Sequence, residues 1–134
     1  MSLTRIFIVE DDTFLGSVMK LTLEKLEQVD VTYFPDPESC LKELHRNPHI
    51  VSIDYMLPGM NGIELMEKIK NYDSEIHCIV VSGQDKLEVV IDTYRRGAVD
   101  YIIKNDNCVV NLENTVKSLC KQVDLKKEIG RAHV

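Results

Sequence analysis

The stretch at residues 6–12 reads IFIVEDD, in which four apolar residues are followed at once by three carboxylates. A continuous apolar run of this length is typical of a strand that is covered on both faces of a parallel sheet. Open parallel sheets bind their ligands beyond the carboxyl ends of their strands, where these carboxylates would stand. This stretch therefore predicts a buried strand with an acidic site at its end.

Four further apolar runs lie at residues 29–34, 50–53, 78–81 and 101–103, with room for a helix between each pair. The run at 29–34 alternates partly, which favours an edge strand. The segments between the runs have apolar residues at helical spacing, as at Leu65, Met66 and Ile69. The alternation predicts an α/β fold: a doubly wound, five-stranded parallel sheet of order 2-1-3-4-5 with helices on both faces.

Local signals mark several helix ends. Asp36-Pro37 is typical of an N-cap followed by proline at the first helical position, and Gly97 is typical of a helix stop. Asn111 is the expected N-cap of the last helix, whose apolar seam ends at Val123. We therefore expect one domain at residues 1–123 and a tail at 124–134, which is a frayed end, a vector-derived remnant or the start of a helical linker.

The composition bounds the function. The 134 residues suit a single domain, and no apolar run approaches the roughly 20 residues that cross a bilayer. Residues 1–4 are no signal peptide, so we expect a cytoplasmic protein without a membrane partner. The net charge of −6, without a basic stripe, argues against direct binding to nucleic acid.

Cysteines and histidines give weaker signals. The four cysteines lack the C-x-x-C spacing of a zinc site, and we expect core thiols in a reducing compartment; they are Cys40, Cys78, Cys108 and Cys120. His45 and His49 flank Pro48, which prevents a helical ligand pair, and both are expected at the surface.

The other strands also end in polar residues: Asp54, Ser82 and Lys104. In the order 2-1-3-4-5, the first and third strands are neighbours, so Asp11 should lie beside Asp54 with Glu10 nearby. Two like charges about 4 Å apart repel by on the order of 4 kcal/mol at an effective dielectric of about 20. Such a cluster calls for a cation, and oxygen ligands with room for water suit Mg²⁺.

With a metal to offset the repulsion, Asp54 can act as a nucleophile toward phosphorus and form an aspartyl phosphate. Lys104 would supply a cation and Ser82 a hydroxyl donor, because phosphoryl transfer depends mainly on positioning and charge stabilisation. Gly83 would leave room for the phosphodonor.

These residues resemble a known family, the receiver domains of two-component response regulators. The resemblance covers residues 5–123 and is carried by four segments: VEDD at 9–12, DYMLPGMNG at 54–62, VSG at 81–83 and GAVDYIIK at 97–104. It implies a phosphoprotein of phosphorelay signal transduction, with a link to transcription regulation, and not an enzyme beyond self-phosphorylation and self-dephosphorylation.

The resemblance also implies roles. Asp54 would accept the phosphoryl group from a histidine kinase or a phosphotransfer protein, and Lys104 would pair with that group. Mg²⁺ would be held by Asp11, Asp54 and the backbone carbonyl of Met56, with Glu10 acting through water. Ser82 and Tyr101 would form a switch pair that remodels the face of the fourth helix, fifth strand and fifth helix.

The same resemblance implies partners. The remodelled face is a candidate homodimer surface, and the chain is either a free-standing receiver or the N-terminal module of a larger regulator with an effector domain. One departure stands out: the family usually has proline after the lysine, often with a cis bond, whereas this chain has Asn105. A cis bond before a residue other than proline costs about 2.5–4 kcal/mol, so a trans Lys104–Asn105 bond is expected.

Three other functions were weighed. A phosphatase of the haloacid dehalogenase type would need an aspartate at the position of Met56. A flavodoxin-like nucleotide binder would need a phosphate loop rich in serine, threonine and glycine where residues 10–12 are acidic. A degenerate receiver, acting as a phosphorylation-independent interaction module, remains an alternative because of Asn105.

Overall fold

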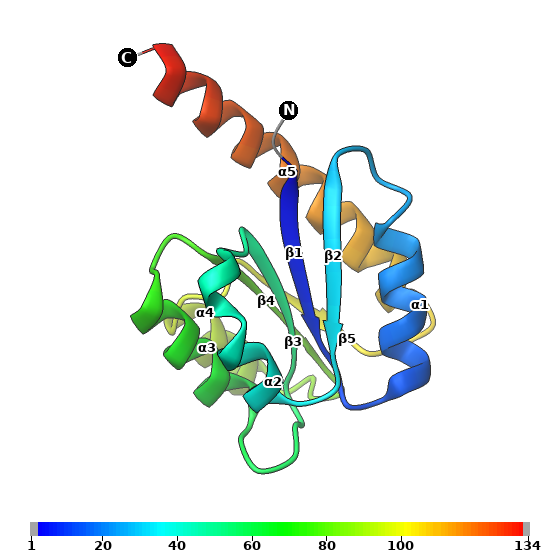
Figure 1. The fold of residues 1–134 in the computed structure, drawn as a ribbon. Coiled ribbons are helices and arrows are strands. Elements are labelled where there is room, and N and C mark those ends of the chain that lie inside the picture. Colours follow the sequence, from blue (N-terminus) through cyan, green and yellow to red (C-terminus); the bar gives the residue numbers. More distant parts are fainter. Residues whose placement is uncertain (1–2, 133–134) are drawn as a thin grey trace.

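The computed structural model describes residues 3–132 and contains one five-stranded sheet in the order β2-β1-β3-β4-β5, with every pairing parallel (Figure 1). The elements are, in chain order, β1 Thr4–Val9, α1 Thr13–Leu23, β2 Val29–Phe34, α2 Pro37–Lys42, the 3-10 turn η1 Leu44–Arg46, β3 Ile50–Asp54, α3 Gly62–Tyr72, β4 His77–Ser82, α4 Leu87–Arg95, β5 Asp100–Ile103 and α5 Cys108–Ala132. The predicted fold class, strand order and edge position of β2 are confirmed.

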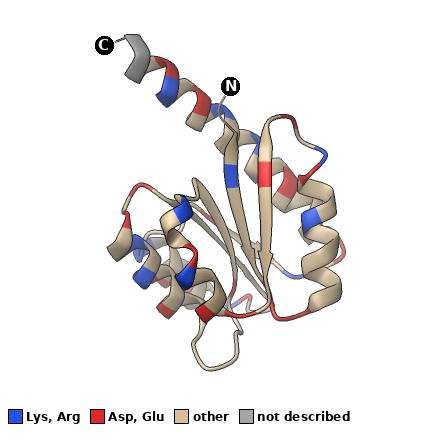
Figure 2. Cartoon of the chain, viewed as in Figure 1, with Lys and Arg blue, Asp and Glu red and all other residues tan. Residues whose placement is uncertain are grey.

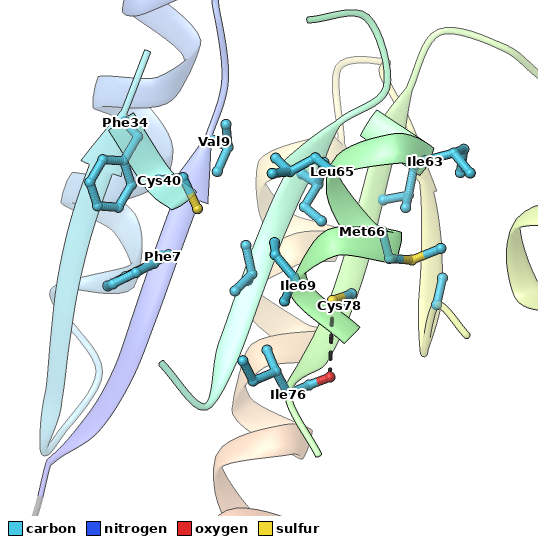
Figure 3. Close-up of a cluster of buried hydrophobic side chains, with 14 of the residues drawn as sticks. Phe7, Val9, Phe34, Cys40, Ile63, Leu65, Met66, Ile69, Ile76 and Cys78 are labelled. Atoms are coloured by element: carbon cyan, nitrogen blue, oxygen red, sulfur yellow. Dashed lines mark hydrogen bonds between the residues drawn. The ribbon is translucent and has the colours of Figure 1, made fainter. Parts of the chain in front are cut away.

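Two hydrophobic cores, one on each face of the sheet, explain why the strands are continuous apolar runs. Within β1, Phe7 and Val9 belong to one core, while Ile6 and Ile8 belong to the other. The first core takes its helical side chains mainly from α3, among them Leu65, Met66 and Ile69 (Figure 3); the second takes them from α1 and α5, among them Met19, Leu23, Leu112, Val116 and Leu119. Every residue of β3 is buried, as expected of the central strand.

The strand register brings the carboxyl ends of neighbouring strands to one edge. Val9 pairs with Ile53, Asp54 pairs with Val81, and Ser82 pairs with Ile103. The loops that leave β1, β3, β4 and β5 therefore start side by side, and Figure 2 shows acidic residues on the loop between β1 and α1. We refer to this side of the sheet as the carboxyl edge.

The helix ends agree with the sequence signals at two places. The Asp36 carboxylate accepts a hydrogen bond from the Ser39 backbone N–H at 2.8 Å and caps α2, with Pro37 following. Gly97, at φ +113°, lies directly after the end of α4 in the left-handed region that favours glycine.

The expected start of α5 at Asn111 was wrong. The helix begins at Cys108, because the Asn105 side-chain oxygen accepts a hydrogen bond from the Asn107 backbone N–H at 2.9 Å and the Asn105 carbonyl accepts one from the Cys108 N–H at 3.1 Å. A short polar side chain thus turns the chain into the helix earlier than its apolar seam indicates. Residues 124–132 continue the same helix, which contradicts the frayed-end alternative for them.

The structure also places the four cysteines and His49. Cys40, Cys78 and Cys108 are buried free thiols, and Cys120 is a half-buried one. The expectation that His49 is a surface residue was wrong, since it is half-buried and its Nδ1 accepts a 2.9 Å hydrogen bond from the Arg5 backbone N–H. Within the described residues, none of the helices is long and apolar enough to span a bilayer.

Gly62, the first residue of α3, fits tightly against the end of β3. A Cβ atom built there would lie 2.4 Å from the Asp54 carbonyl oxygen and 2.8 Å from the Tyr55 Cα. The Gly62 N–H also donates a 2.7 Å hydrogen bond to the Tyr55 carbonyl. By contrast, a Cβ at Gly83 would meet nothing within 4 Å.

We expect Gly62→Ala to lower the free energy of unfolding by about 1–3 kcal/mol, because the methyl group must displace backbone. Gly83→Ala is the matched control and should change stability by less than about 0.5 kcal/mol. Urea denaturation of both variants checks this, and equal losses of stability would contradict the close approach at Gly62.

Candidate functional site

The acidic loop after β1 is held from several directions. Glu10 is buried, its backbone N–H donates to the Phe34 carbonyl at 3.1 Å, and its carbonyl accepts the Tyr33 hydroxyl at 2.5 Å. The Asp12 carboxylate accepts from the Leu15 N–H at 3.1 Å and caps α1. Asp11 lies between them and is exposed. Three consecutive acids therefore have different environments, and only two of them face the site.

Asp54 ends β3 with its side chain only 2% exposed. Its Oδ1 accepts a 3.2 Å hydrogen bond from the Met56 backbone N–H and lies 3.1 Å from the Lys104 ammonium. Its Oδ2 is buried and has no hydrogen-bond partner among the described residues. The same carboxylate thus has one oxygen that is fixed and one that is free.

The predicted convergence of charged residues is present. One carboxylate oxygen from each of Glu10, Asp11 and Asp54 lies within 4.8 Å of the others, and Lys104 Nζ is 3.1 Å from both Asp54 Oδ1 and Glu10 Oε1. These four side chains come from the ends of β1, β3 and β5.

The donor set fits a hard divalent cation. All its ligand atoms are carboxylate oxygens. Asp54 Oδ2 and Glu10 Oε1 are buried without a hydrogen bond among the described residues. Lys104 lies close to Glu10 Oε1, but its hydrogen bond to this carboxylate goes to Oε2 at 3.2 Å. A buried carboxylate oxygen without a donor is costly, and a cation would satisfy it.

The pKa values of the three carboxyl groups shift in different directions. Burial, then hydrogen bonding to Asp54 and its charge, raises the pKa of Glu10 to about 8. Hydrogen bonding to Asp54 raises the pKa of Asp11 as well. Burial opposes ionisation of Asp54, but the neighbouring Glu10 and Asp11 carboxyl groups and the Lys104 charge outweigh it and lower the pKa of Asp54. In the absence of metal, these shifts favour a protonated Glu10 beside a charged Asp54.

Ser82 and Tyr101 share a partner that the sequence did not indicate. The buried Ser82 Oγ accepts a 2.9 Å hydrogen bond from the Gln84 backbone N–H, and the Tyr101 hydroxyl donates a 2.8 Å hydrogen bond to the Gln84 carbonyl. The Tyr101 ring is 9% exposed and belongs to the first hydrophobic core. Because Gln84 acts through its main chain, its residue type carried no signal in the sequence.

Other sequence-predicted features of the site are also located. The Met56 side chain is exposed, which leaves only its backbone near Asp54. The bond between Lys104 and Asn105 is trans, since the described residues contain no cis peptide bond. The Lys104 backbone N–H donates to the Ser82 carbonyl at 2.8 Å, so the lysine backbone continues the β4–β5 ladder.

Comparison with known proteins bears on the same residues. The family model of the response regulator receiver domain matches residues 6–113. The chain belongs to this family. The matched region extends from β1 into α5 and includes Glu10, Asp11, Asp54 and Lys104.

Individual proteins similar to this chain also include response regulators. The transcriptional regulatory protein MalR of Bacillus subtilis is 32% identical over 103 residues, which is 74% of this chain and 43% of MalR. The chemotaxis protein CheY of Bacillus subtilis is 31% identical over 101 residues, covering 75% of this chain and 84% of CheY. A CheY-like receiver domain protein from Methanospirillum hungatei has a solved structure that is 32% identical, with a TM-score of 0.78 and coverage of 92% of this chain and 98% of that one. The receiver chain thus spans less than half of MalR and most of CheY.

The raised pKa of Glu10 predicts how the metal-free receiver responds to pH. A carboxyl whose pKa rises from 4.5 to about 8 on folding stabilises the fold below about pH 4.5, and this contribution is lost as the pH rises toward 8. We expect the free energy of unfolding to fall by on the order of 1–3 kcal/mol across this window. Urea denaturation in EDTA at a series of pH values measures it.

Glu10→Gln is the control for this experiment, because the amide cannot ionise. The loss of stability over the same pH window should be largely absent in that variant. An equally steep loss would assign the effect to another group.

Proposed function

We propose that Asp54 of this receiver accepts a phosphoryl group from a histidine kinase or a phosphotransfer protein. The observation that carries the proposal is the Asp54 carboxylate itself. It is buried and ionised, one oxygen is fixed by Met56 N–H and Lys104, and the other has no bond to a protein donor. A free oxygen on an oriented carboxylate is what attack on phosphorus requires.

The proposed transfer is a single displacement. An electron pair on the free Asp54 oxygen forms the new O–P bond while the bond from phosphorus to the donor breaks, and the donor departs with the electron pair of the broken bond. Lys104 lies close enough to Asp54 to pair with the incoming negative charge. The product is an acyl phosphate on Asp54.

Mg²⁺ is the proposed cofactor, held by Asp11, Asp54 and the backbone carbonyl of Met56, with Glu10 acting through water. When bound, it would neutralise part of the phosphoryl charge and offset the repulsion within the cluster. Support comes from the converging carboxylate oxygens of Glu10, Asp11 and Asp54.

Ser82 and Tyr101 are the proposed switch pair. The Ser82 hydroxyl is buried at the carboxyl edge and would exchange its bond with the Gln84 N–H for one to the phosphoryl oxygen. Because Tyr101 holds the Gln84 carbonyl, that movement would pull on the loop that leads into α4. The ring is already directed inward, so the loop is the part that has to move.

The resulting signal would be read on the face formed by α4, β5 and α5. This face has several exposed apolar side chains, which is typical of an interaction surface: Leu87, Ile91, Tyr94, Val99 and Val110. It is the proposed site of a homodimer or of contact with an effector domain. We take residues 1–123 as the receiver and residues 124–134 as the connection to such a domain. Four free cysteines are consistent with a cytoplasmic location.

Acetyl phosphate with Mg²⁺ should add one phosphate mass to the wild-type protein in intact mass spectrometry, and Asp54→Asn should remove the adduct. Asp85→Asn alters an exposed aspartate in the loop between β4 and α4 and should leave labelling unchanged. Wild-type protein without an adduct at any workable Mg²⁺ concentration would favour a phosphorylation-independent interaction module.

Mg²⁺ should raise the melting temperature of the wild-type protein, since a ligand that binds only the folded state stabilises it. Asp11→Asn removes one carboxylate of the cluster, and we expect it to weaken Mg²⁺ binding by about tenfold or more. Asp12→Asn is a matched control, because asparagine also caps helices and Asp12 is outside the cluster. Thermal melts in a Mg²⁺ titration distinguish the two variants, and equal effects would contradict the proposed ligand set.

A further inference from the structure

A cavity of about 420 Å³ lies at the amino ends of β1, β3 and β4, opposite the carboxyl edge. Its walls come from three places: the residues around the starts of these strands, the loop before β4, and the second half of α5. Figure 1 shows α5 passing behind the amino end of β1 and projecting beyond the sheet. We refer to this space as the α5 cavity. Its volume is within the range of roughly 300–1,000 Å³ that is usual for small-molecule sites.

The α5 cavity has an apolar floor and a charged wall. Pro48, Ile76 and Val123 are buried residues of the lining. Arg5, Lys126 and Lys127 also line it, and two acids, Asp73 and Glu75, stand in the exposed loop before β4.

The two acids are already engaged. Asp73 Oδ1 accepts the Glu75 backbone N–H at 3.0 Å, and Glu75 Oε2 pairs with Lys126 Nζ at 2.7 Å. The side chains of that ion pair are 73% and 72% exposed, so it forms part of the solvent-facing rim. Neither acid has an ion pair with Lys127 among the described residues.

Lys127 is the lining residue whose charge has no partner among the described residues. Its Nζ atom is buried and has no hydrogen-bond partner in the part of the chain that the structure describes. A buried ammonium without an acceptor opposes folding, and such groups are normally paired. The Arg5 guanidinium is only partly engaged: its Nε donates to the Asn47 carbonyl at 2.7 Å, and its Nη2 lies 3.4 Å from His49 Nε2.

Two histidines of the lining have lowered pKa values, with burial as the main cause and neighbouring cations as a smaller one. Burial, and after it the charges of Arg5 and Lys127, lowers the pKa of His49 to about 4. Burial, and after it the charges of Lys70 and Lys126, lowers the pKa of His77. Both side chains are half-buried in the cavity wall and neutral near pH 7.

We propose that the α5 cavity binds a small molecule with an oxyanion group, with Lys127 and Arg5 taking the carboxylate or phosphate and the apolar floor taking the rest. Metal binding does not compete, because the described residues contain one cluster of three converging metal-ligand side chains and it lies at the carboxyl edge. The site is independent of phosphorylation chemistry on Asp54.

Ligand binding there would act on α5. Gln122, Val123, Lys126 and Lys127 all belong to this helix, whereas the rest of the wall belongs to the sheet and its loops. An anion between Lys127 and Arg5 would join the two parts through charge-assisted hydrogen bonds. The bound molecule would therefore fix the second half of α5 against the domain.

Nuclear magnetic resonance titration tests the proposal, with inorganic phosphate and succinate as separate probes and no divalent cation present. The acidic cluster repels anions under these conditions. We expect backbone amide shifts that saturate at Arg5, His49, His77 and Lys127 with at least one probe, and the better probe distinguishes a phosphate from a carboxylate ligand. Shifts that are absent with both probes, or that do not concentrate at these residues, overturn the proposal.

Lys127→Met keeps the length of the side chain and removes its charge, and Lys121→Met is the matched control at an exposed position of α5. We expect Lys127→Met to weaken anion binding by about tenfold, the usual effect of losing one charge-assisted hydrogen bond, and Lys121→Met to leave it unchanged. Equal affinities in the two variants contradict the proposal.

Thermal melts without anion supply a second readout. Because Lys127 is unpaired in the folded protein, Lys127→Met should keep or raise the melting temperature. A lower melting temperature together with unchanged anion binding would assign Lys127 a purely structural role and overturn the proposal.

Discussion

The constraint on which this structure depends is the repulsion among carboxylates at the carboxyl edge. Glu10, Asp11 and Asp54 bring oxygens within 4.8 Å of one another, and Lys104 is the cation that contacts Glu10 and Asp54. The cluster persists because hydrophobic cores on both faces of the sheet fix the strands that carry it. Burial and hydrogen bonding then place the proton on Glu10 and leave Asp54 charged. The fold thus supplies the energy that keeps an electrostatically unfavourable arrangement in place.

The sequence predicted the sheet and the acidic site well, for the same physical reason. A strand that is buried on both faces is apolar along its length, so the sequences of β1 and β3 are continuous apolar runs. The polar residues that follow these runs mark one edge of the sheet. The start of α5 was not predictable from apolar spacing, because an Asn105 side-chain bond decides it. The role of Gln84 was hidden because only its backbone takes part. The α5 cavity was hidden because it joins Arg5 to Lys127, and only the folded chain brings these residues together.

The two ends of the sheet have opposite electrostatic character, and β1 connects them. Arg5 stands near its start, beside the α5 cavity, and Glu10 directly follows its end. Six residues of strand span about 20 Å, so an anion in the cavity would lie far from Asp54. Communication between the ends would need a rigid element, and α5 is suited to this: its first half packs in the core beside β5, and its second half lines the cavity.

The unbroken length of α5 has a mechanical consequence. Twenty-five helical residues make a rod about 37 Å long, and its buried seam from Leu112 to Val123 anchors only the first part. The nine residues from 124 to 132 extend beyond this seam by about 14 Å, so a tilt of about 10° at Val123 would displace the far end by roughly 2 Å. Small rearrangements at the buried seam would in this way be enlarged at the far end of the helix.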